Sequence, residues 1–276
     1  MERSEENIGT ARGCGVAFIH YNRQRDLPMM IAVRNATFIS HLQLWRQLEA
    51  RGLESSKRSF SWRLQRLTDA GAIEKLPPRL PYAGAVYTIT RLGLECLEAC
   101  GEGLVSLHSD SKTLANPAQI QHYLEIVEIR AAIERSGILK EWTDDVEIRS
   151  MNQAIGVPLA KNYDAIAELE LDGVRRRIAI EYERHLKSVE RYRAIVGALE
   201  NEDQIDLLLY LTSSLDLLYQ LIGHFSEETF PVLAAPSSAF CPAPLTARLH
   251  VADQCGTNRT TLAALLKSPA TLTKRK

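Results

Sequence analysis

Residues 163–187, YDAIAELELDGVRRRIAIEYERHLK, constrain the fold more than any other stretch of the chain. Asp172-Gly173 stands between two runs of β-type residues, and such a dipeptide is typical of a two-residue hairpin turn in which both residues take positive φ. With this turn at the tip, Leu171 faces Val174, and every later facing pair follows from the alternation of side chains along a strand. The sequence therefore predicts a β-hairpin with a fixed register.

Two pairs of opposite charge support this register, because Glu170 faces Arg175 and Glu168 faces Arg177. The other face of the hairpin is apolar apart from Arg176, and we expect it to be buried. Its apolar members are Ala165, Ala167, Leu169, Leu171, Val174, Ile178, Ile180 and Tyr182.

The open end of the hairpin departs from this favourable pattern. The same register places Asp164 directly opposite Glu181, and Glu183 follows on the same face. Like charges that face each other destabilise a sheet unless a cation, a proton or another positive group compensates them. We therefore regard these three carboxylates as candidate site residues.

The composition is that of a globular protein, with 45% apolar and 24% charged residues in a chain of 276. This length suits one large domain or two ordinary ones. No run approaches the roughly 18 apolar residues of a membrane span, and no leader resembles a signal peptide. The five cysteines are scattered and lack the second Cys/His pair that a zinc site needs. We expect a cytoplasmic protein with no membrane contact.

Residues 25–100 follow a polar leader over residues 1–24 and have a distinct element pattern. Helical patterns near 27–33, 41–50 and 57–70 precede two strands and a closing helix over 92–99. The runs RLQRLTDAGAIEKL and YTITRLGLECL resemble the third helix, wing and closing helix of winged helix-turn-helix proteins. The resemblance implies that the third helix enters the major groove of double-stranded DNA.

This region is basic although the net charge of the whole chain is −1. Seven Lys/Arg stand against two acids between Ser55 and Arg91, and phosphate binding needs such a local excess. A solvated helix face, or a surface for protein contacts alone, would explain the same charges. The DNA-binding candidates that the resemblance implies are Lys57, Arg58, Ser59, Ser61, Trp62, Arg63 and Arg66 on the helix, with Lys75 and Arg79 on the wing.

A small, polar stretch over residues 101–117 is expected to link this domain to a second one over residues 118–236. The patterns there predict a helix over 118–135, a strand over 146–150, the hairpin, a helix over 189–199, a buried strand over 205–212, a helix over 215–225 and a last strand near 231–235. This order resembles the αβββαβ core of the PD-(D/E)XK, or restriction-endonuclease-like, superfamily. The predicted fold class is mixed α/β: a winged helix-turn-helix followed by that core.

The PD-(D/E)XK resemblance implies a site for a divalent metal ion, Mg²⁺ or Mn²⁺. Asp164 takes the place of the first acid and Glu181 that of the second, and both are candidate metal ligands. Glu183 stands where the superfamily motif has lysine, so that Glu183 or Glu125 would add a ligand instead. The missing cation would then come from Lys187, four residues further on. A site of this kind is typical of a DNA endonuclease that nicks or cuts.

Taken whole, residues 25–236 resemble the replication-relaxation family of plasmid and mobile-element proteins. The resemblance lies in His122, in the E-x-E-x-x-x-K run over 181–187 and in RYR over 191–193. It implies a DNA-binding protein that acts in replication, relaxation or mobilisation, beside a relaxase or replication proteins. Two alternatives stay open: an inactive regulator or relaxosome accessory factor that uses the core as a scaffold, and a winged-helix repressor with an unrelated ligand-sensing domain.

Two further expectations concern assembly and the C-terminal end. Helices over 92–99 and 215–225 are candidate surfaces for a homodimer. Residues 237–276 are rich in Pro, Ser, Thr and Ala and are expected to form a flexible tail, with at most a short helix near 260–267.

Overall fold

The computed structural model describes residues 21–77, 84–103, 116–154, 158–225, 230–252 and 258–267. Most of the expected leader, most of the expected linker, Arg79 and the last nine residues lie outside these ranges. The chain forms two compact units, one up to Leu124 and one from Glu125 onward, and each is described by itself.

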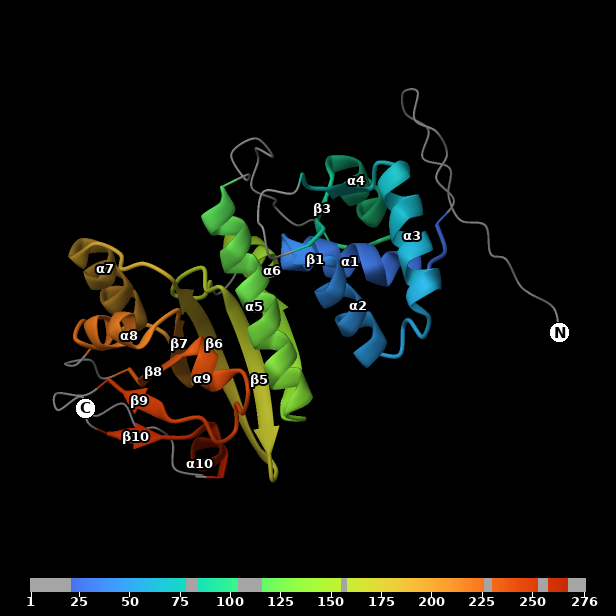
Figure 1. Ribbon diagram of the computed structural model, residues 1–276. Helices are drawn as coiled ribbons and strands as arrows, with labels where there is room; N and C mark the ends of the chain where they lie inside the picture. Colours follow the sequence, from blue (N-terminus) through green and yellow to red (C-terminus); the bar gives the residue numbers. More distant parts are fainter. Residues whose placement is uncertain are drawn as a thin grey trace. The chain divides into compact units, whose positions relative to one another are not determined.

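The N-terminal unit has three helices, two strands and a closing helix in the predicted order (Figure 1). A short additional strand between the first two helices completes a three-stranded antiparallel sheet of order β1-β3-β2. The elements are α1 (Asp26–Ala36), β1 (Ile39–Ser40), α2 (His41–Ala50), α3 (Lys57–Asp69), β2 (Ile73–Lys75), β3 (Val86–Ile89), α4 (Arg91–Ala99) and the first turns of α5 (Pro117–Arg135).

Local signals in the sequence explain where these helices begin and end. Ser40 and Gln43 form a reciprocal capping box at the start of α2, and the Thr90 hydroxyl accepts the N–H of Gly93 at the start of α4. Gly71 follows α3 with φ of 76° and supplies the left-handed residue that ends a helix. Gly93 is needed for close packing, because a Cβ there would lie 2.2 Å from the carbonyl oxygen of Ala72.

The C-terminal unit is built on a seven-stranded sheet of order β10-β9-β8-β7-β6-β5-β4. The pairs β6–β7 and β7–β8 are parallel, and the others are antiparallel. After α5 its elements are β4 (Leu139–Asp144), α6 (Asp145–Gln153), β5 (Ala165–Leu171), β6 (Val174–Glu183), α7 (Val189–Leu199), β7 (Leu207–Thr212), α8 (Leu215–Ile222), β8 (Val232–Pro236), α9 (Ser237–Phe240), β9 (Leu249–Val251), β10 (Arg259–Thr260) and α10 (Leu262–Lys267).

Helices cover both faces of this sheet and bury a core on each. One core joins α5, α9 and α10 to the face that carries Ala165, Ile180 and Tyr182. The other joins α7 and α8 to the face that carries Ile166 and Ala179. Figure 1 shows α5 along one side of β5 and β6, with α7 and α8 on the other side.

The hairpin has the predicted register from its tip to the pair of Ala165 and Ile180. Leu171 pairs with Val174 and Ala165 with Ile180, and the intermediate pairs follow in step. The turn residues Asp172 and Gly173 have φ of 51° and 81°. The predicted mixed α/β class is also correct, with the sheet as its centre.

The predicted strand over 146–150 is wrong, because these residues belong to helix α6 and the strand lies earlier, at β4. The alternation of Val146 and Ile148 imitates a strand, and both side chains are buried. A helix start signal overrides it, since the Glu147 carboxylate accepts the backbone N–H of Asp144 at 3.1 Å.

The expectation of a flexible tail from residue 237 is also wrong for the described part, 237–252 and 258–267. Strand β9 extends the main sheet beside β8, and Phe240, Leu249, Leu262 and Leu266 are fully buried in the core. These few large side chains, spaced among small and polar residues, supply enough apolar surface to hold the segment. The short helix expected near 260–267 is present as α10. Among the described residues, no helix is long and apolar enough to cross a membrane.

Candidate functional site

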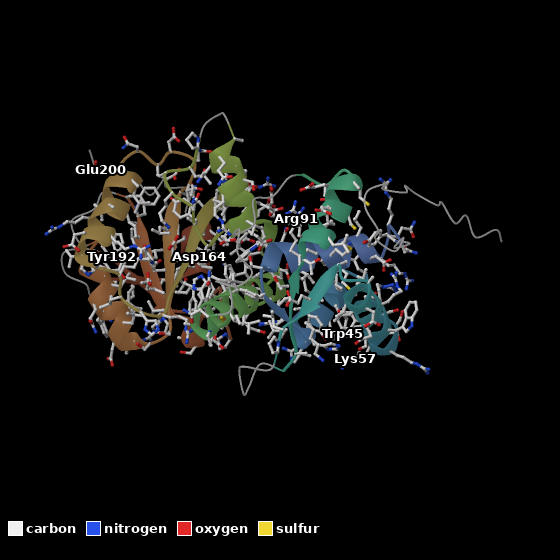
Figure 2. The ribbon with its side chains drawn as sticks, turned by 90° about the horizontal axis from the view of Figure 1, so that it is seen from above. Trp45, Lys57, Arg91, Asp164, Tyr192 and Glu200 are labelled. Carbon is white, nitrogen blue, oxygen red and sulfur yellow. The ribbon has the colours of Figure 1, made fainter. Side chains whose placement is uncertain are left out.

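Asp164 lies one residue before β5, at the open end of the hairpin. Its carboxylate accepts a hydrogen bond from the backbone N–H of Tyr182 at 2.8 Å. This hydrogen bond holds Asp164 next to Glu181, so that Asp164 contributes to raising the pKa of Glu181. The structure therefore brings together the two acids that the register predicted to meet. Figure 2 labels Asp164 in the C-terminal unit, with Tyr192 of α7 in the same unit.

Glu181 is buried, with 5% of its surface exposed, and two lysines face its carboxylate. The Lys161 ammonium donates to Oε1, and Lys187 Nζ lies 4.0 Å from Oε2. Burial raises the pKa of Glu181, the Asp164 charge raises it further, and the two lysines oppose both effects. A raised pKa with two cations alongside marks a carboxylate that needs positive charge to stay ionised.

Glu183, the last residue of β6, forms a second ion pair with Lys187. The Lys187 ammonium donates to the Glu183 carboxylate four residues earlier in the chain. Burial alone would lower the pKa of Lys187, but the charges of Glu181 and Glu183 outweigh it and raise that pKa above its ordinary value. Lys187 thus places a cation beside both glutamates, Glu181 and Glu183, as we expected from the sequence.

Lys161 is a site residue that the sequence analysis missed. Its ammonium lies 4.6 Å from the ring centroid of Tyr163 and its side chain is only 18% exposed. The available signal was the spacing Lys161-x-x-Asp164, which puts a lysine in the segment that leads to the first acid.

The loop that carries Lys161 is fixed by two side chains, the buried Glu202 and the partly buried Asn152. Glu202, 1% exposed, accepts the Tyr163 hydroxyl at 2.9 Å and the Ala160 N–H at 3.0 Å. Asn152 of α6 donates to the carbonyl of Lys161 at 3.2 Å. The backbone of the loop is therefore held independently of the Lys161–Glu181 ion pair.

Tyr210 provides a further polar group beside the acids, on the neighbouring strand β7. It pairs with Glu181 in the parallel register of β6 and β7, and its side chain is fully buried. Its hydroxyl has no hydrogen-bond partner within the part of the chain that the structure describes. Burial raises its pKa, and the charges of Glu181, Glu183 and Asp164 raise it further. A buried hydroxyl of this kind needs a polar partner, such as water or a hydrated ligand.

Glu125 does not join the acids. It contributes to raising the pKa of Tyr182 and of Cys241, and Tyr182 belongs to the core on the opposite face of the sheet. The expectation that Glu125 adds a metal ligand is therefore wrong. His122 lies in the N-terminal unit, where its ring meets that of Tyr123 edge-on at 5.5 Å.

The remaining donors fit a hydrated Mg²⁺ better than a fully protein-ligated ion. Within residues 21–77, 84–103, 116–154, 158–225, 230–252 and 258–267, no group of three or more His, Cys, Asp or Glu is placed to hold a metal. Mg²⁺, however, commonly takes only one or two carboxylates together with waters and substrate phosphate oxygens. Asp164 and Glu181 supply such a pair, and Tyr210 is the neighbour of Glu181 on the adjacent strand.

The candidate DNA-binding helix α3 presents one exposed face. Lys57, Arg58, Ser61 and Trp62 are exposed on it, and Trp62 is 64% exposed. Ser59 is half-buried, Lys75 on β2 is exposed, and Arg79 lies outside the described residues. The Lys57 ammonium lies 6.0 Å from the ring of Trp45, as the labelled side chains in Figure 2 let the reader follow.

The two other arginines of α3 have structural partners. Arg63 is buried between Glu54, at 2.8 Å, and Asp26, at 3.7 Å. Its assignment as a groove-facing residue is wrong, because buried carboxylates draw the guanidinium inward. Arg66 is 30% exposed, pairs with Asp26 and lies 5.7 Å from the ring of Trp62.

Comparison with known proteins places most of this chain in one family model. The model described as replication-relaxation matches residues 32–205, which is more than half of the chain. No curated protein matches this chain. Among solved structures, the restriction endonuclease FokI bound to DNA aligns with 8% identity and a TM-score of 0.24, over 80% of this chain and 44% of FokI.

Proposed function

Because this chain belongs to the replication-relaxation family, we propose that it binds double-stranded DNA through its N-terminal unit and acts on DNA of a plasmid or other mobile element through its C-terminal unit. In this proposal the protein acts in the cytoplasm together with a relaxase or replication proteins. The observation that carries the proposal is the half-buried group of Asp164, Glu181 and Glu183 with Lys161 and Lys187 at one end of the sheet.

The proposed DNA-binding element is a winged helix-turn-helix with α3 as its recognition helix. Its support is the element order of the N-terminal unit and the exposed face of α3. Lys57 and Arg58 would contact phosphates, and Ser61 and Trp62 would lie toward the groove. Arg66, half-exposed and beside Trp62, adds positive charge at the same surface.

The proposed activity of the C-terminal unit is Mg²⁺- or Mn²⁺-dependent cleavage of a phosphodiester bond, in the manner of a nickase. Asp164 and Glu181 would hold the ion, which when bound would activate water and offset charge on the phosphate. The Asp164–Tyr182 hydrogen bond orients the first carboxylate. Glu183 keeps Lys187 charged and in place, so that its ammonium would face the negative phosphate. The Tyr210 hydroxyl would donate a hydrogen bond to a water molecule of the hydrated ion.

A second candidate function is supported by the same ion pairs. Each glutamate already has a lysine partner, and these pairs compensate the facing acids without a metal ion. On this basis the C-terminal unit would be an inactive scaffold in a DNA-binding regulator or relaxosome accessory factor. Leu215 and Tyr219, which are 47% and 50% exposed on α8, would then serve as part of a homodimer surface.

A plasmid-nicking assay separates the two. Supercoiled plasmid is incubated with the wild-type chain, with Asp164→Asn and with Glu200→Gln, whose exposed side chain directly after α7 provides a matched control. The nuclease proposal expects nicked circles with Mg²⁺ or Mn²⁺ for wild type and control, and none for Asp164→Asn. Binding of duplex DNA without nicking by any of the three would favour the scaffold.

A further inference from the structure

Two lysines face the carboxylates, and their surroundings differ. Lys187 contacts two acids, since its ammonium donates to Glu183 and lies 4.0 Å from Glu181. Among the described residues, the Lys161 ammonium contacts the carboxylate of Glu181 alone, and it also lies 4.6 Å from the ring centroid of Tyr163. Removing an ammonium from two carboxylates is harder than removing it from one, because each lost contact leaves a buried charge uncompensated.

The backbone around Lys161 does not depend on its ion pair. Glu202 holds Ala160 and Tyr163, and Asn152 holds the Lys161 carbonyl. A rotation of the Lys161 side chain would therefore free Glu181 and leave the loop in place. The Lys161 side chain is 18% exposed and that of Lys187 is 23% exposed, so the two lysines differ in the number of carboxylates that they contact and not in their access to solvent.

The Tyr210 hydroxyl is an independent sign that a polar ligand enters this group. It is fully buried and lacks a partner within the described residues, and Tyr210 is the neighbour of Glu181 on the adjacent strand β7. A hydrated cation between Asp164 and Glu181 would give that hydroxyl a water to bond.

We propose that Lys161 is the exchangeable counter-ion of this site: it neutralises Glu181 when no divalent cation is bound, and it leaves that carboxylate when one binds. Lys187 stays with Glu183 throughout. The inference rests on the proposed metal-dependent function, and it assigns to Lys161 the role of adjusting cation affinity and of carrying its freed positive charge to a DNA phosphate.

Chemical labelling of the wild-type chain tests this directly. Reductive methylation of lysine amines, read by mass spectrometry, is compared with and without Mg²⁺. Methylation of Lys161 should rise several-fold with Mg²⁺, since an ammonium released from a buried carboxylate becomes accessible. Exposed Lys75, far from the acids in sequence and on β2, serves as the internal control and should not change. Unchanged Lys161 methylation at saturating Mg²⁺ would overturn the inference.

Calorimetric titration with Mn²⁺ provides the second arm, with wild type, Lys161→Met and Lys187→Met. When a cation must displace a lysine, its apparent affinity is the intrinsic affinity multiplied by the fraction of molecules in which the lysine has left the site. Lys161→Met should therefore bind Mn²⁺ about tenfold more tightly than wild type. Lys187→Met should show a smaller gain. Equal affinity of wild type and Lys161→Met would overturn the role of Lys161 and leave the metal site standing. Absence of Mn²⁺ binding in both would overturn the proposed metal-dependent function together with the inference.

Discussion

The carboxylate of Glu202 accepts a hydrogen bond from the hydroxyl of Tyr163 at 2.9 Å, and both side chains are almost fully buried. The same carboxylate accepts the backbone N–H groups of Ala160 and Gln204, at 3.0 and 2.9 Å. One side chain therefore fixes the loop that leads to Lys161 and Asp164.

Replacing Glu202 with Ala should destabilise the protein by about 2–4 kcal/mol, because the buried Tyr163 hydroxyl and two partly buried backbone N–H groups lose their acceptor. Urea unfolding of the two proteins measures the difference. Glu200→Ala, two residues away and exposed, is the matched control and should shift the free energy of unfolding by less than about 0.5 kcal/mol. Equal effects of the two substitutions would show that Glu202 is not the anchor.

Two helical glycines should respond in opposite directions to the same substitution. Gly93→Ala in α4 should destabilise the protein, because the new Cβ would lie 2.2 Å from the Ala72 carbonyl oxygen and 2.6 Å from Cδ1 of Ile89. Gly197→Ala in α7 should stabilise it by about 0.5–1 kcal/mol, since nothing lies within 4 Å of that Cβ and alanine favours helix. Thermal unfolding of both variants provides the test, and a stabilised Gly93→Ala would contradict the close packing of α4.

Asp144 predicts a pH dependence of stability. Burial is the largest effect on its carboxyl group and raises the pKa from 3.8 to about 6. The Arg130 guanidinium, 3.0 Å from the Asp144 carboxylate, opposes this rise. The native state then binds a proton more tightly than the unfolded chain between about pH 4 and 6. Stability should therefore fall as pH rises through this window, by roughly 2–3 kcal/mol from this group.

Asp144→Asn isolates that contribution. The amide oxygen still accepts the Trp142 indole N–H, which bonds Asp144 at 2.8 Å, but the group no longer titrates. Urea unfolding at pH 4 and pH 6.5 should show a smaller loss of stability for the variant than for wild type. An identical pH dependence of the two would mean that Asp144 ionises in the native state as it does in water.

The arginines of α3 should separate binding from folding. Arg58→Ala should weaken binding to duplex DNA and reduce the slope of log affinity against log salt by about 1, because one phosphate contact is lost. Arg63→Ala should instead destabilise the fold, since it leaves Asp26 and Glu54 buried without that guanidinium. Fluorescence anisotropy over a salt series and urea unfolding measure the two effects.

The control for this pair is Arg91→Ala, which removes an equally positive, exposed side chain from the start of α4. It should reduce the free energy of unfolding by less than Arg63→Ala does, and it should reduce the salt slope by less than Arg58→Ala does. A salt slope that Arg58→Ala and Arg91→Ala reduce equally would point to diffuse attraction and away from α3 as the DNA-binding element.

The hairpin was predictable because its information is local. The Asp172-Gly173 turn fixes the pairing, and the charges of Glu170 and Arg175, which lie 2.9 Å apart, confirm it within six residues of sequence. The elements of both units follow from similar short-range patterns. Helix α6 is an exception, since nine residues hold too few turns to separate a helical period from an alternating one.

The parts that could not be predicted depend on distant residues. The position of Lys161 is set by Glu202, some forty residues later, through hydrogen bonds that no local pattern reveals. Arg63 is drawn inward by Asp26, which belongs to another helix. Glu125 lies on the far face of the sheet because α5 packs there through its neighbouring apolar side chains.

We propose that Asp164 and Glu181 hold a divalent cation that takes the place of Lys161. A crystal structure of the wild-type chain grown with Mn²⁺ tests it most directly, through the anomalous signal of the metal. The account predicts a Mn²⁺ peak within ligand distance of one oxygen from each carboxylate, with the Lys161 ammonium turned away from Glu181. Saturating Mn²⁺ with no peak there, and Lys161 still bound to Glu181, would contradict it.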